Sequence, residues 1–181
     1  MDGVGFRAAR LEDAAPLGAL HVASWRETYA GLFPDAFLDG LSADARAVMW
    51  QKVLSDPAAF DETAVFVAES NGALIGFGAC SAQRDEALAA QGYDGEIGAI
   101  YVLRSHQGAG VGRRLMGLLA RQLRDQDRHA ASLWVLRENE AARTFYERLG
   151  GRIVGEKPDA QSGTIRTELA YGWADLAALS A

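Results

Sequence analysis

A glycine-rich run separates an apolar stretch from a helical pattern in the middle of the chain. The apolar stretch extends from Ile97 to Leu103, the helical pattern begins near Val111, and the run reads Gln107-Gly108-Ala109-Gly110-Val111-Gly112-Arg113-Arg114. A strand that breaks into glycines before a helix presents bare backbone N–H groups, backed by the positive end of the helix dipole. Glycine suits this place because a Cβ would obstruct an approaching anion and because tight turns require positive φ. The run predicts a strand–loop–helix unit that binds a phosphorylated ligand, with a plain turn as the alternative.

Two familiar nucleotide-binding patterns fit this run poorly. A P-loop requires lysine and a hydroxyl residue after its last glycine, whereas Arg113 and Arg114 follow the glycines here. The dinucleotide pattern requires Gly-x-Gly-x-x-Gly, whereas these glycines stand at 108, 110 and 112. The run therefore favours a phosphorylated ligand other than ATP or NAD.

Composition limits the fold and the partners. The chain has 181 residues, 49% of them hydrophobic and 23% charged, which suits one globular domain, 1–181. The formal charge of 18 − 24 = −6 disfavours nucleic acid as a partner. We find neither a secretory signal nor a run of roughly 18 apolar residues, so we expect a cytoplasmic protein without membrane attachment. A single cysteine, Cys80, and three scattered histidines form no metal-ligand cluster, so no metal is expected.

Periodicity predicts alternating strands and helices. Strand patterns cover residues 4–8, 64–68, 74–80, 96–102, 131–136, 152–156 and 164–171, and helical patterns cover about 11–30, 42–54, 111–124 and 139–149. Asn71-Gly72 predicts a hairpin turn, and residues 84–95 are predicted to be a surface loop. This order implies an α/β fold with a mixed sheet and helices on both faces.

Two motifs, in this order, resemble those of the GCN5-related N-acetyltransferases, the GNAT family. The first is Glu96-Ile97-Gly98-Ala99-Ile100-Tyr101-Val102 followed by Gln107-Gly108-Ala109-Gly110-Val111-Gly112, and the second is Leu133-Trp134-Val135 followed by Asn139-Glu140, Ala142, Phe145-Tyr146 and Leu149-Gly150. The element order is similar along nearly the whole chain. The resemblance implies the GNAT fold, a central, mixed, mostly antiparallel twisted sheet of about seven strands with a V-shaped splay between strands 4 and 5. One departure is Arg104, where many members have proline.

The resemblance also implies acetyl-CoA as the co-substrate, lying in the V. Strand edges that splay apart leave unpaired backbone groups, which an amide-rich pantetheine arm can satisfy like an added strand. The donor-binding residues that the resemblance implies are the backbone of Ile100, Tyr101 and Val102 for pantetheine, and Gly108, Ala109, Gly110, Val111, Gly112 and Arg113 for pyrophosphate. Gln107 would flank that phosphate together with Arg113.

Glu96 is the predicted general base. An alkylamine has a pKa near 10.4, so a group that removes its proton aids attack on a thioester at neutral pH. Glu96 lies eleven positions before Gln107, where the family's strand-borne base often stands. We expect it to share a strand face with Gly98, Ile100 and Val102. The alternative is a solvated acid at the start of a strand.

Tyr146 is the predicted general acid for the departing thiolate. It follows Asn139 by seven residues, two helical turns, so both side chains point the same way. Tyr146 would reach the sulfur, and Asn139 would bind the pantetheine amide. Phe145 shares a helix face with Ala141 and Leu149, which leaves Tyr146 less reason to be in the core. The alternative is an ordinary core aromatic residue.

The acceptor is less constrained. Trp25 and Tyr29 lie in a segment, 24–32, that resembles one in a subgroup including polyamine acetyltransferases, and they are predicted to wall the acceptor site; ordinary core packing is the alternative. The leading function is acetyl-CoA-dependent N-acetylation of a primary amine, favouring a small molecule such as a polyamine, by direct attack in a ternary complex. The alternatives are acetylation of a protein or peptide, and a non-catalytic acyl-CoA sensor. The sequence is compatible with a homodimer and does not decide the oligomeric state.

Overall fold

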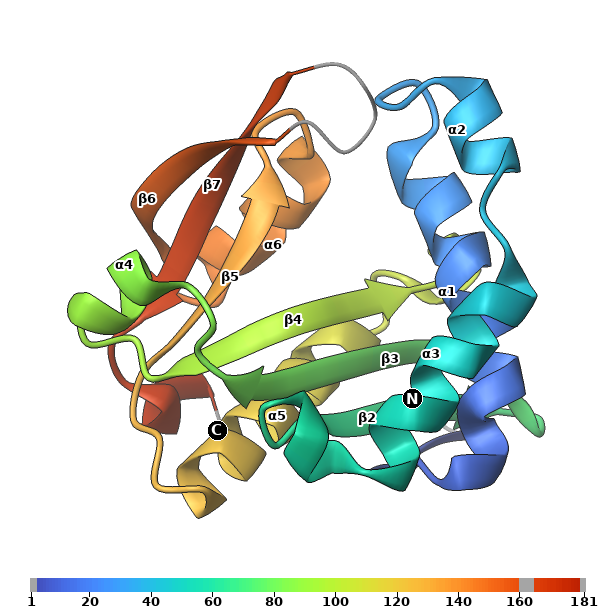
Figure 1. Cartoon of the computed structure of the whole chain (residues 1–181), viewed down its shortest axis with the longest axis horizontal. Helices are drawn as coiled ribbons and strands as arrows, with labels where there is room; N and C mark the ends of the chain where they lie inside the picture. The colour runs from blue at the N-terminus through green and yellow to red at the C-terminus, as the bar shows by residue number, and fades with distance from the viewer. Residues whose placement is uncertain (1–2, 160–164, 180–181) are drawn as a thin grey trace.

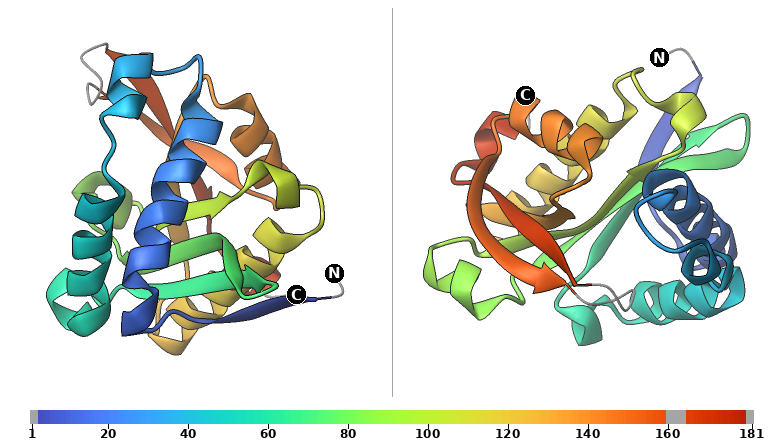
Figure 2. Two further views of the ribbon diagram at one scale, coloured as in Figure 1. Left: turned by 90° about the vertical axis from the view of Figure 1, so that its right-hand side faces the viewer. Right: turned by 90° about the horizontal axis from the view of Figure 1, so that it is seen from above.

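The computed structural model describes residues 3–159 and 165–179, which form an open sheet with helices on both faces (Figure 1, Figure 2). The strands are β1 (Val4–Ala8), β2 (Ala64–Ser70), β3 (Ala73–Ala82), β4 (Gly95–Val102), β5 (Ala131–Leu136), β6 (Arg152–Asp159) and β7 (Arg166–Trp173). They form one seven-stranded sheet in the order β1-β2-β3-β4-β5-β7-β6. Every neighbouring pair is antiparallel except β4 and β5, which are parallel. This confirms the predicted fold class.

The longer helices divide between the two faces. α1 (Ala14–Tyr29) and α3 (Ala43–Ser55) cover one face, and α5 (Val111–Asp125) and α6 (Glu140–Arg148) cover the other (Figure 2). Shorter helices are α2 (Asp35–Asp39), α4 (Glu86–Ala90), η1 (Leu11–Asp13), η2 (Pro57–Phe60), η3 (Arg104–His106) and η4 (Leu176–Leu179). The segment 84–95, predicted as loop, contains α4, because Asp85 caps its N-terminus and Leu88 anchors it in the core.

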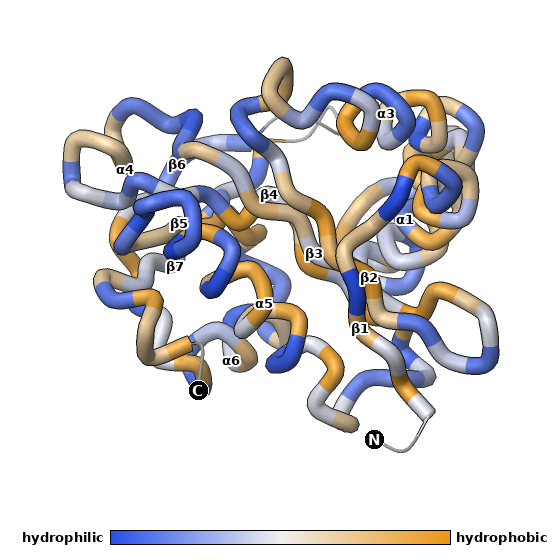
Figure 3. Tube along the Cα trace, turned by 90° about the horizontal axis from the view of Figure 1, so that it is seen from below, coloured by the Kyte–Doolittle hydropathy of each residue, from blue (hydrophilic) through white to orange (hydrophobic). Residues whose placement is uncertain are grey.

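Local sequence signals fix several element ends. The Ser42 hydroxyl accepts a hydrogen bond from the Ala45 N–H at 3.1 Å and so begins α3. Asn71 and Gly72 have φ of 51° and 77°, the conformation of a tight hairpin turn between β2 and β3. Hydrophobic positions run along β2 and β3 and recur on α5, whose apolar face lies on the sheet (Figure 3).

A β-bulge interrupts β4. Ala79 of β3 pairs with Ala99 of β4, whereas the next residue, Cys80, pairs with Ile97. Gly98 is therefore an extra residue in β4. An inserted residue reverses the inward and outward alternation of a strand beyond that point.

The bulge decides which face carries Glu96. Glu96 pairs with Ser81 and lies on the α1–α3 face, as Tyr101 does, whereas Ile100 and Val102 pack on the α5 face. The expectation that Glu96 shares a face with Ile100 and Val102 is wrong, because it assumed an unbroken two-residue period. Glu96 and Tyr101 instead belong to the same side of the sheet.

The sheet opens between β4 and β5. Only Gly95 with Ala131 and Glu96 with Ser132 are paired, so the two strands separate after two residues (Figure 1). This is the predicted V-shaped splay. Among the described residues, no strand lies between the backbone edges beyond Glu96 on β4 and beyond Ser132 on β5.

Close packing of α1 on α3 depends on Gly18. A Cβ at Gly18 would lie 2.5 Å from the Ala43 carbonyl oxygen and 2.6 Å from the Ala47 nitrogen. We expect Gly18→Ala to lower the free energy of unfolding by about 2 kcal/mol, because backbone atoms must move apart. Gly5→Ala, whose Cβ would meet nothing nearer than 4.0 Å, is the matched control. Urea unfolding measures both, and equal stability of the two variants would contradict the close contact.

Candidate functional site

The loop between β4 and α5 presents unpartnered backbone donors. Gly108 and Gly110 have φ of 76° and 83°, and Gly110 is the N-cap of α5. Within the part of the chain that the structure describes, the N–H groups of residues 108–110 donate to no backbone carbonyl. Those of 111–113 belong to the first turn of α5, where intrahelical acceptors are missing. Donors at a helix N-terminus suit a phosphate group.

Two predicted phosphate contacts have structural roles in this loop. The Gln107 amide nitrogen donates to the Val102 carbonyl at 2.9 Å and so joins the loop to the end of β4. A Cβ at Gly112 would lie 3.1 Å from the Phe145 ring, so glycine allows α6 to pack on the first turn of α5. Arg113 is exposed and forms no ion pair with any described residue.

Arg104 ties the end of α1 to the start of the loop. Its backbone N–H donates to the Glu27 carboxylate at 2.7 Å, and its guanidinium donates to the Glu27 carbonyl at 2.7 Å. Proline lacks an N–H and could not form the first bond. The residue that departs from the family pattern therefore forms a specific bridge in this chain.

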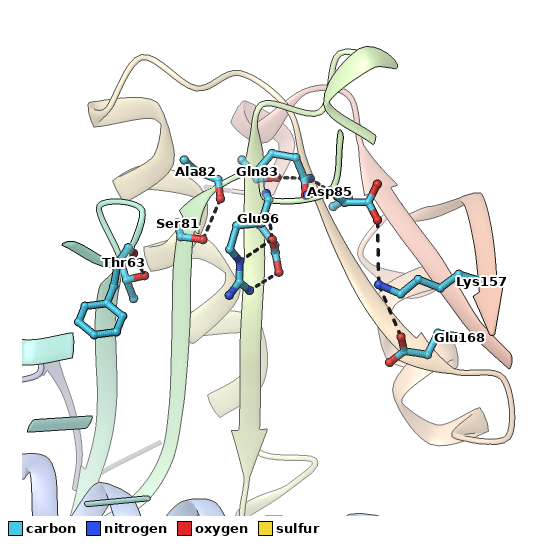
Figure 4. A network of polar contacts seen from close by, with 12 residues as sticks. Thr63, Ser81, Ala82, Gln83, Asp85, Glu96, Lys157 and Glu168 are labelled. Carbon is cyan, nitrogen blue, oxygen red and sulfur yellow. Dashed lines mark hydrogen bonds and ion pairs between the residues drawn. The ribbon is translucent and has the colours of Figure 1, made fainter. Parts of the chain in front are cut away.

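Glu96 lies at the apex of the V, but its carboxylate is engaged. Arg84 donates to it from Nη2 at 2.5 Å, from Nε at 3.0 Å and from its backbone N–H at 3.3 Å (Figure 4). The guanidinium passes over the bulge, since a Cβ at Gly98 would lie 3.3 Å from Arg84 Nη2. The bond to Glu96 raises the pKa of Arg84, so the guanidinium stays charged. Sequence reasoning missed Arg84, and no local pattern marks it.

Two phenols join α1 to β4. The hydroxyls of Tyr29 and Tyr101 lie 3.2 Å apart. Burial raises the pKa of both groups, so both hydroxyls stay protonated at neutral pH. Trp25 meets Tyr29 edge-on at 4.9 Å, and both pack with Phe33 around Leu136 at the end of β5. The predicted acceptor residues thus lie half-buried at the open end of the V.

Tyr146 is the buried residue of α6. It is 7% exposed and its ring meets those of Tyr171 at 5.7 Å and Trp173 at 6.0 Å. Phe145 and Leu149 pack against the core as predicted but are only half-buried, whereas Ala141 is exposed, so the expectation that Tyr146 lies outside the core is wrong. The reason is that β7 offers α6 an aromatic surface, which the sequence of α6 alone does not reveal.

The Tyr146 hydroxyl belongs to the same group of phenols. Burial, and then the nearby Tyr29 phenol, raises the pKa of Tyr146, and Tyr146 in turn raises that of Tyr101. Three phenols from α1, β4 and α6 therefore lie within electrostatic range of one another beside the V. Asn139 caps α6 through its side-chain oxygen, which accepts from the Ala142 N–H at 3.2 Å.

Other features of the described residues lie away from this site. A hollow of about 450 Å³ is lined by β1, β2, η2 and the end of α5, and contains none of the predicted site residues. Across residues 3–159 and 165–179, no three His, Cys, Asp or Glu side chains converge as metal ligands. Over the same ranges, no helix has the length and apolar character needed to cross a membrane.

Comparison with known proteins agrees with this geometry. The profile of the Acetyltransferase (GNAT) family matches residues 22–151. The chain belongs to this family. An uncharacterized N-acetyltransferase, YuaI, of Bacillus subtilis (strain 168) is 32% identical over 177 residues, covering 97% of this chain and 96% of the relative. The chain is therefore an N-acetyltransferase.

Two further N-acetyltransferases are similar to this chain, one in its structure and one in part of its sequence. The structure of a PaiA N-acetyltransferase from Thermoplasma acidophilum in complex with coenzyme A superposes with a TM-score of 0.74 at 16% identity, covering 94% of this chain and 99% of that one. A [ribosomal protein bS18]-alanine N-acetyltransferase of Haemophilus influenzae is 35% identical over 81 residues, 44% of this chain and 49% of the relative.

Cys80 is a buried free cysteine. Its side chain is buried on the α5 face, and burial raises the pKa of the thiol to about 12. We expect less than a tenth of the protein to react with iodoacetamide at pH 8 in the folded state, and complete reaction in urea, because only the thiolate attacks. Mass spectrometry of the alkylated protein measures the fraction. Rapid labelling of the folded enzyme would contradict an inert, buried thiol.

Proposed function

We propose that this enzyme transfers the acetyl group of acetyl-CoA to the primary amine of a small molecule by direct attack in a ternary complex. The observation that carries the proposal is the opening between β4 and β5, with the unpartnered N–H groups of residues 108–113 after the end of β4. A GNAT protein of the same fold, solved with coenzyme A, supports the choice of donor.

The residues present fit this donor. The backbone of Ile100, Tyr101 and Val102 lies on an unpaired edge that a pantetheine amide can pair with. The N–H groups of 108–113 and the charge of Arg113 suit the pyrophosphate. Asn139 uses its oxygen as a helix cap, which leaves its amide N–H₂ to bind a carbonyl. The donor supplies the thioester, and an N–H of β4 would polarise its carbonyl.

Tyr146 would protonate the leaving sulfur. Its raised pKa keeps the phenol protonated, as an acid catalyst requires. As the acceptor nitrogen bonds to the acetyl carbon, the carbon–sulfur bond breaks and the sulfur takes the phenol proton. The nitrogen loses a proton on becoming an amide, which restores the phenol. No covalent enzyme intermediate is needed.

Glu96 would remove the first proton from the acceptor ammonium once the Arg84 guanidinium is displaced from the Glu96 carboxylate. The Arg84 guanidinium occupies both Glu96 carboxylate oxygens, which the acceptor ammonium would have to reach. The incoming ammonium, also a cation, can replace the guanidinium without leaving the carboxylate unpaired. In the absence of an acceptor, the Arg84 guanidinium would then take the position beside Glu96 that the acceptor ammonium binds.

A peptide N-terminus is the second candidate acceptor. The relative named as a ribosomal-protein alanine N-acetyltransferase favours it, although the match spans less than half of this chain. A non-catalytic sensor is disfavoured, since the chain is an N-acetyltransferase.

Thiol release from acetyl-CoA, measured with polyamines, aminoglycosides, amino acids and short peptides, tests the function. We expect a small amine to be acetylated, and Tyr146→Phe and Glu96→Gln each to lower kcat by roughly 10²-fold, as loss of an acid or base does. Arg84→Met should keep kcat, because it removes only the group that the acceptor displaces. Full activity of both Tyr146→Phe and Glu96→Gln would overturn the assigned roles, and peptides as the only acceptors would favour the second candidate.

Gly108→Ala tests the donor site, with Gly72→Ala as its matched control. Both glycines have positive φ, 76° and 77°, and an added Cβ at either would meet nothing within 4 Å. Each variant should lose about 1 kcal/mol of stability through backbone strain. Only Gly108→Ala should weaken coenzyme A binding, by about tenfold, because its N–H lies in the anion-binding loop. Calorimetry measures the dissociation constant of coenzyme A for each variant. Equal affinity of the two variants would argue against pyrophosphate binding at this loop.

A further inference from the structure

The wall of the V formed by β5, β6 and β7 already binds a primary ammonium group, that of the chain's own Lys157. The Lys157 Nζ lies 3.8 Å from the Glu168 carboxylate and 4.0 Å from the Asp85 carboxylate (Figure 4). It also lies 4.0 Å from the centroid of the Trp134 ring. An aromatic face and two carboxylates are the surroundings that an ammonium group prefers. The wall is therefore complementary to this chemical group.

The Lys157 ammonium only partly balances the negative charge of the Glu168 carboxylate. Its side chain is 20% exposed, and the contact with Lys157, at 3.8 Å, is longer than a hydrogen bond. Burial raises the pKa of Glu168 by more than Lys157 lowers it. A closer cation would stabilise this carboxylate, which Lys157 cannot do while it is also held over Trp134 and beside Asp85.

Glu168 lies on the part of β7 that is paired with the end of β5, at the open end of the V. It pairs across the sheet with Leu136, which packs in the cluster that contains Tyr29. After burial, the Glu168 carboxylate contributes to the raised pKa of Tyr29. The Tyr29 hydroxyl in turn lies 3.2 Å from that of Tyr101. Tyr29 of α1 is therefore placed between Glu168 on β7 and Tyr101 on β4.

Glu96 and Glu168 lie on the same face of the sheet but at opposite ends of β5. Glu96 pairs with Ser132 and Glu168 with Leu136, so 136 − 132 = 4 residues separate them along β5. At about 3.3 Å per residue this is roughly 13 Å along β5, and two strand spacings of about 4.8 Å across β5 raise the separation of the two backbone positions to roughly 16 Å. A long polyamine could therefore reach from one carboxylate toward the other, whereas a short diamine could not.

We infer that Glu168 anchors a second ammonium group of the acceptor, at the place that the Lys157 ammonium now occupies, while the reacting amine lies toward β4. The inference rests on the proposed amine acetylation and narrows its acceptor to long polyamines. Lys157 is then a competitor for the anchor, which the acceptor displaces. Specificity arises because a monoamine cannot use both places.

The opposite effects of two substitutions test this anchor. Binding of spermine and of butylamine is measured by calorimetry with coenzyme A present. Glu168→Gln should weaken spermine binding about tenfold, as loss of a charged hydrogen bond does, and leave butylamine binding unchanged. Lys157→Met should tighten spermine binding severalfold, because it removes the competing cation.

Glu156→Gln is the matched control. Glu156 lies on the same hairpin, but it is exposed and pairs with Arg137 at 2.8 Å. This variant should bind both amines as the unmodified enzyme does. A general loss of charge on the hairpin would instead affect Glu156→Gln and Glu168→Gln alike.

Three results would overturn the anchor: no spermine binding by the unmodified enzyme, an equal effect of Glu168→Gln on the binding of both amines, or weaker spermine binding by Lys157→Met.

Failure of the proposed function would give different results. If spermine binds through Glu168 but no amine releases thiol from acetyl-CoA, the anchor stands and the proposed reaction fails. If butylamine and spermine are acetylated equally well by Glu168→Gln and by the unmodified enzyme, the reaction stands and the anchor fails.

Discussion

Loss of pairing between β4 and β5 after two residues is the constraint on which the site depends. It leaves two backbone edges without partners, and unpaired buried peptide groups are unfavourable unless something else binds them. The bulge at Gly98 acts with this opening, because it turns Glu96 and Tyr101 to the α1–α3 face while Ile100 and Val102 pack toward α5. A donor lying along the open edge would therefore have the acceptor residues on one side and the α5 packing on the other.

The two arms of the V are held apart by side-chain contacts rather than by the sheet. On the β4 arm, Arg104 binds the end of α1 through Glu27, and Tyr29 meets Tyr101. The same end of α1 reaches the β5 arm through the aromatic cluster around Leu136. On the opposite face, the missing Cβ of Gly112 lets α6 approach α5. Helices thus span the opening on both faces, which keeps it open without backbone pairing.

Sequence signals predicted what depends on neighbours in the chain. The Asn71-Gly72 turn, the cap at Ser42 and the glycine loop follow from local conformational preference, and all three are present. What failed depends on distant residues. The two-residue period of β4 gave the wrong face for Ile100, because the bulge is set by pairing with β3. The helical period gave the wrong burial for Tyr146, because β7 supplies the aromatic surface that it packs on. The Arg84–Glu96 pair joins the segment between β3 and α4 to the start of β4 and has no local signal.

The two carboxylates on the α1–α3 face differ in how firmly they hold their cations. Arg84 gives Glu96 hydrogen bonds at 2.5, 3.0 and 3.3 Å, whereas Lys157 approaches Glu168 only to 3.8 Å. A bidentate guanidinium is the stronger partner, and the longer ammonium contact is the easier one to exchange. A cationic acceptor would therefore meet Glu168 first and displace Arg84 later. In that order, replacement of the Lys157 ammonium would take place at the open end of the V. Glu96 would stay paired with Arg84 until an acceptor had bound at Glu168.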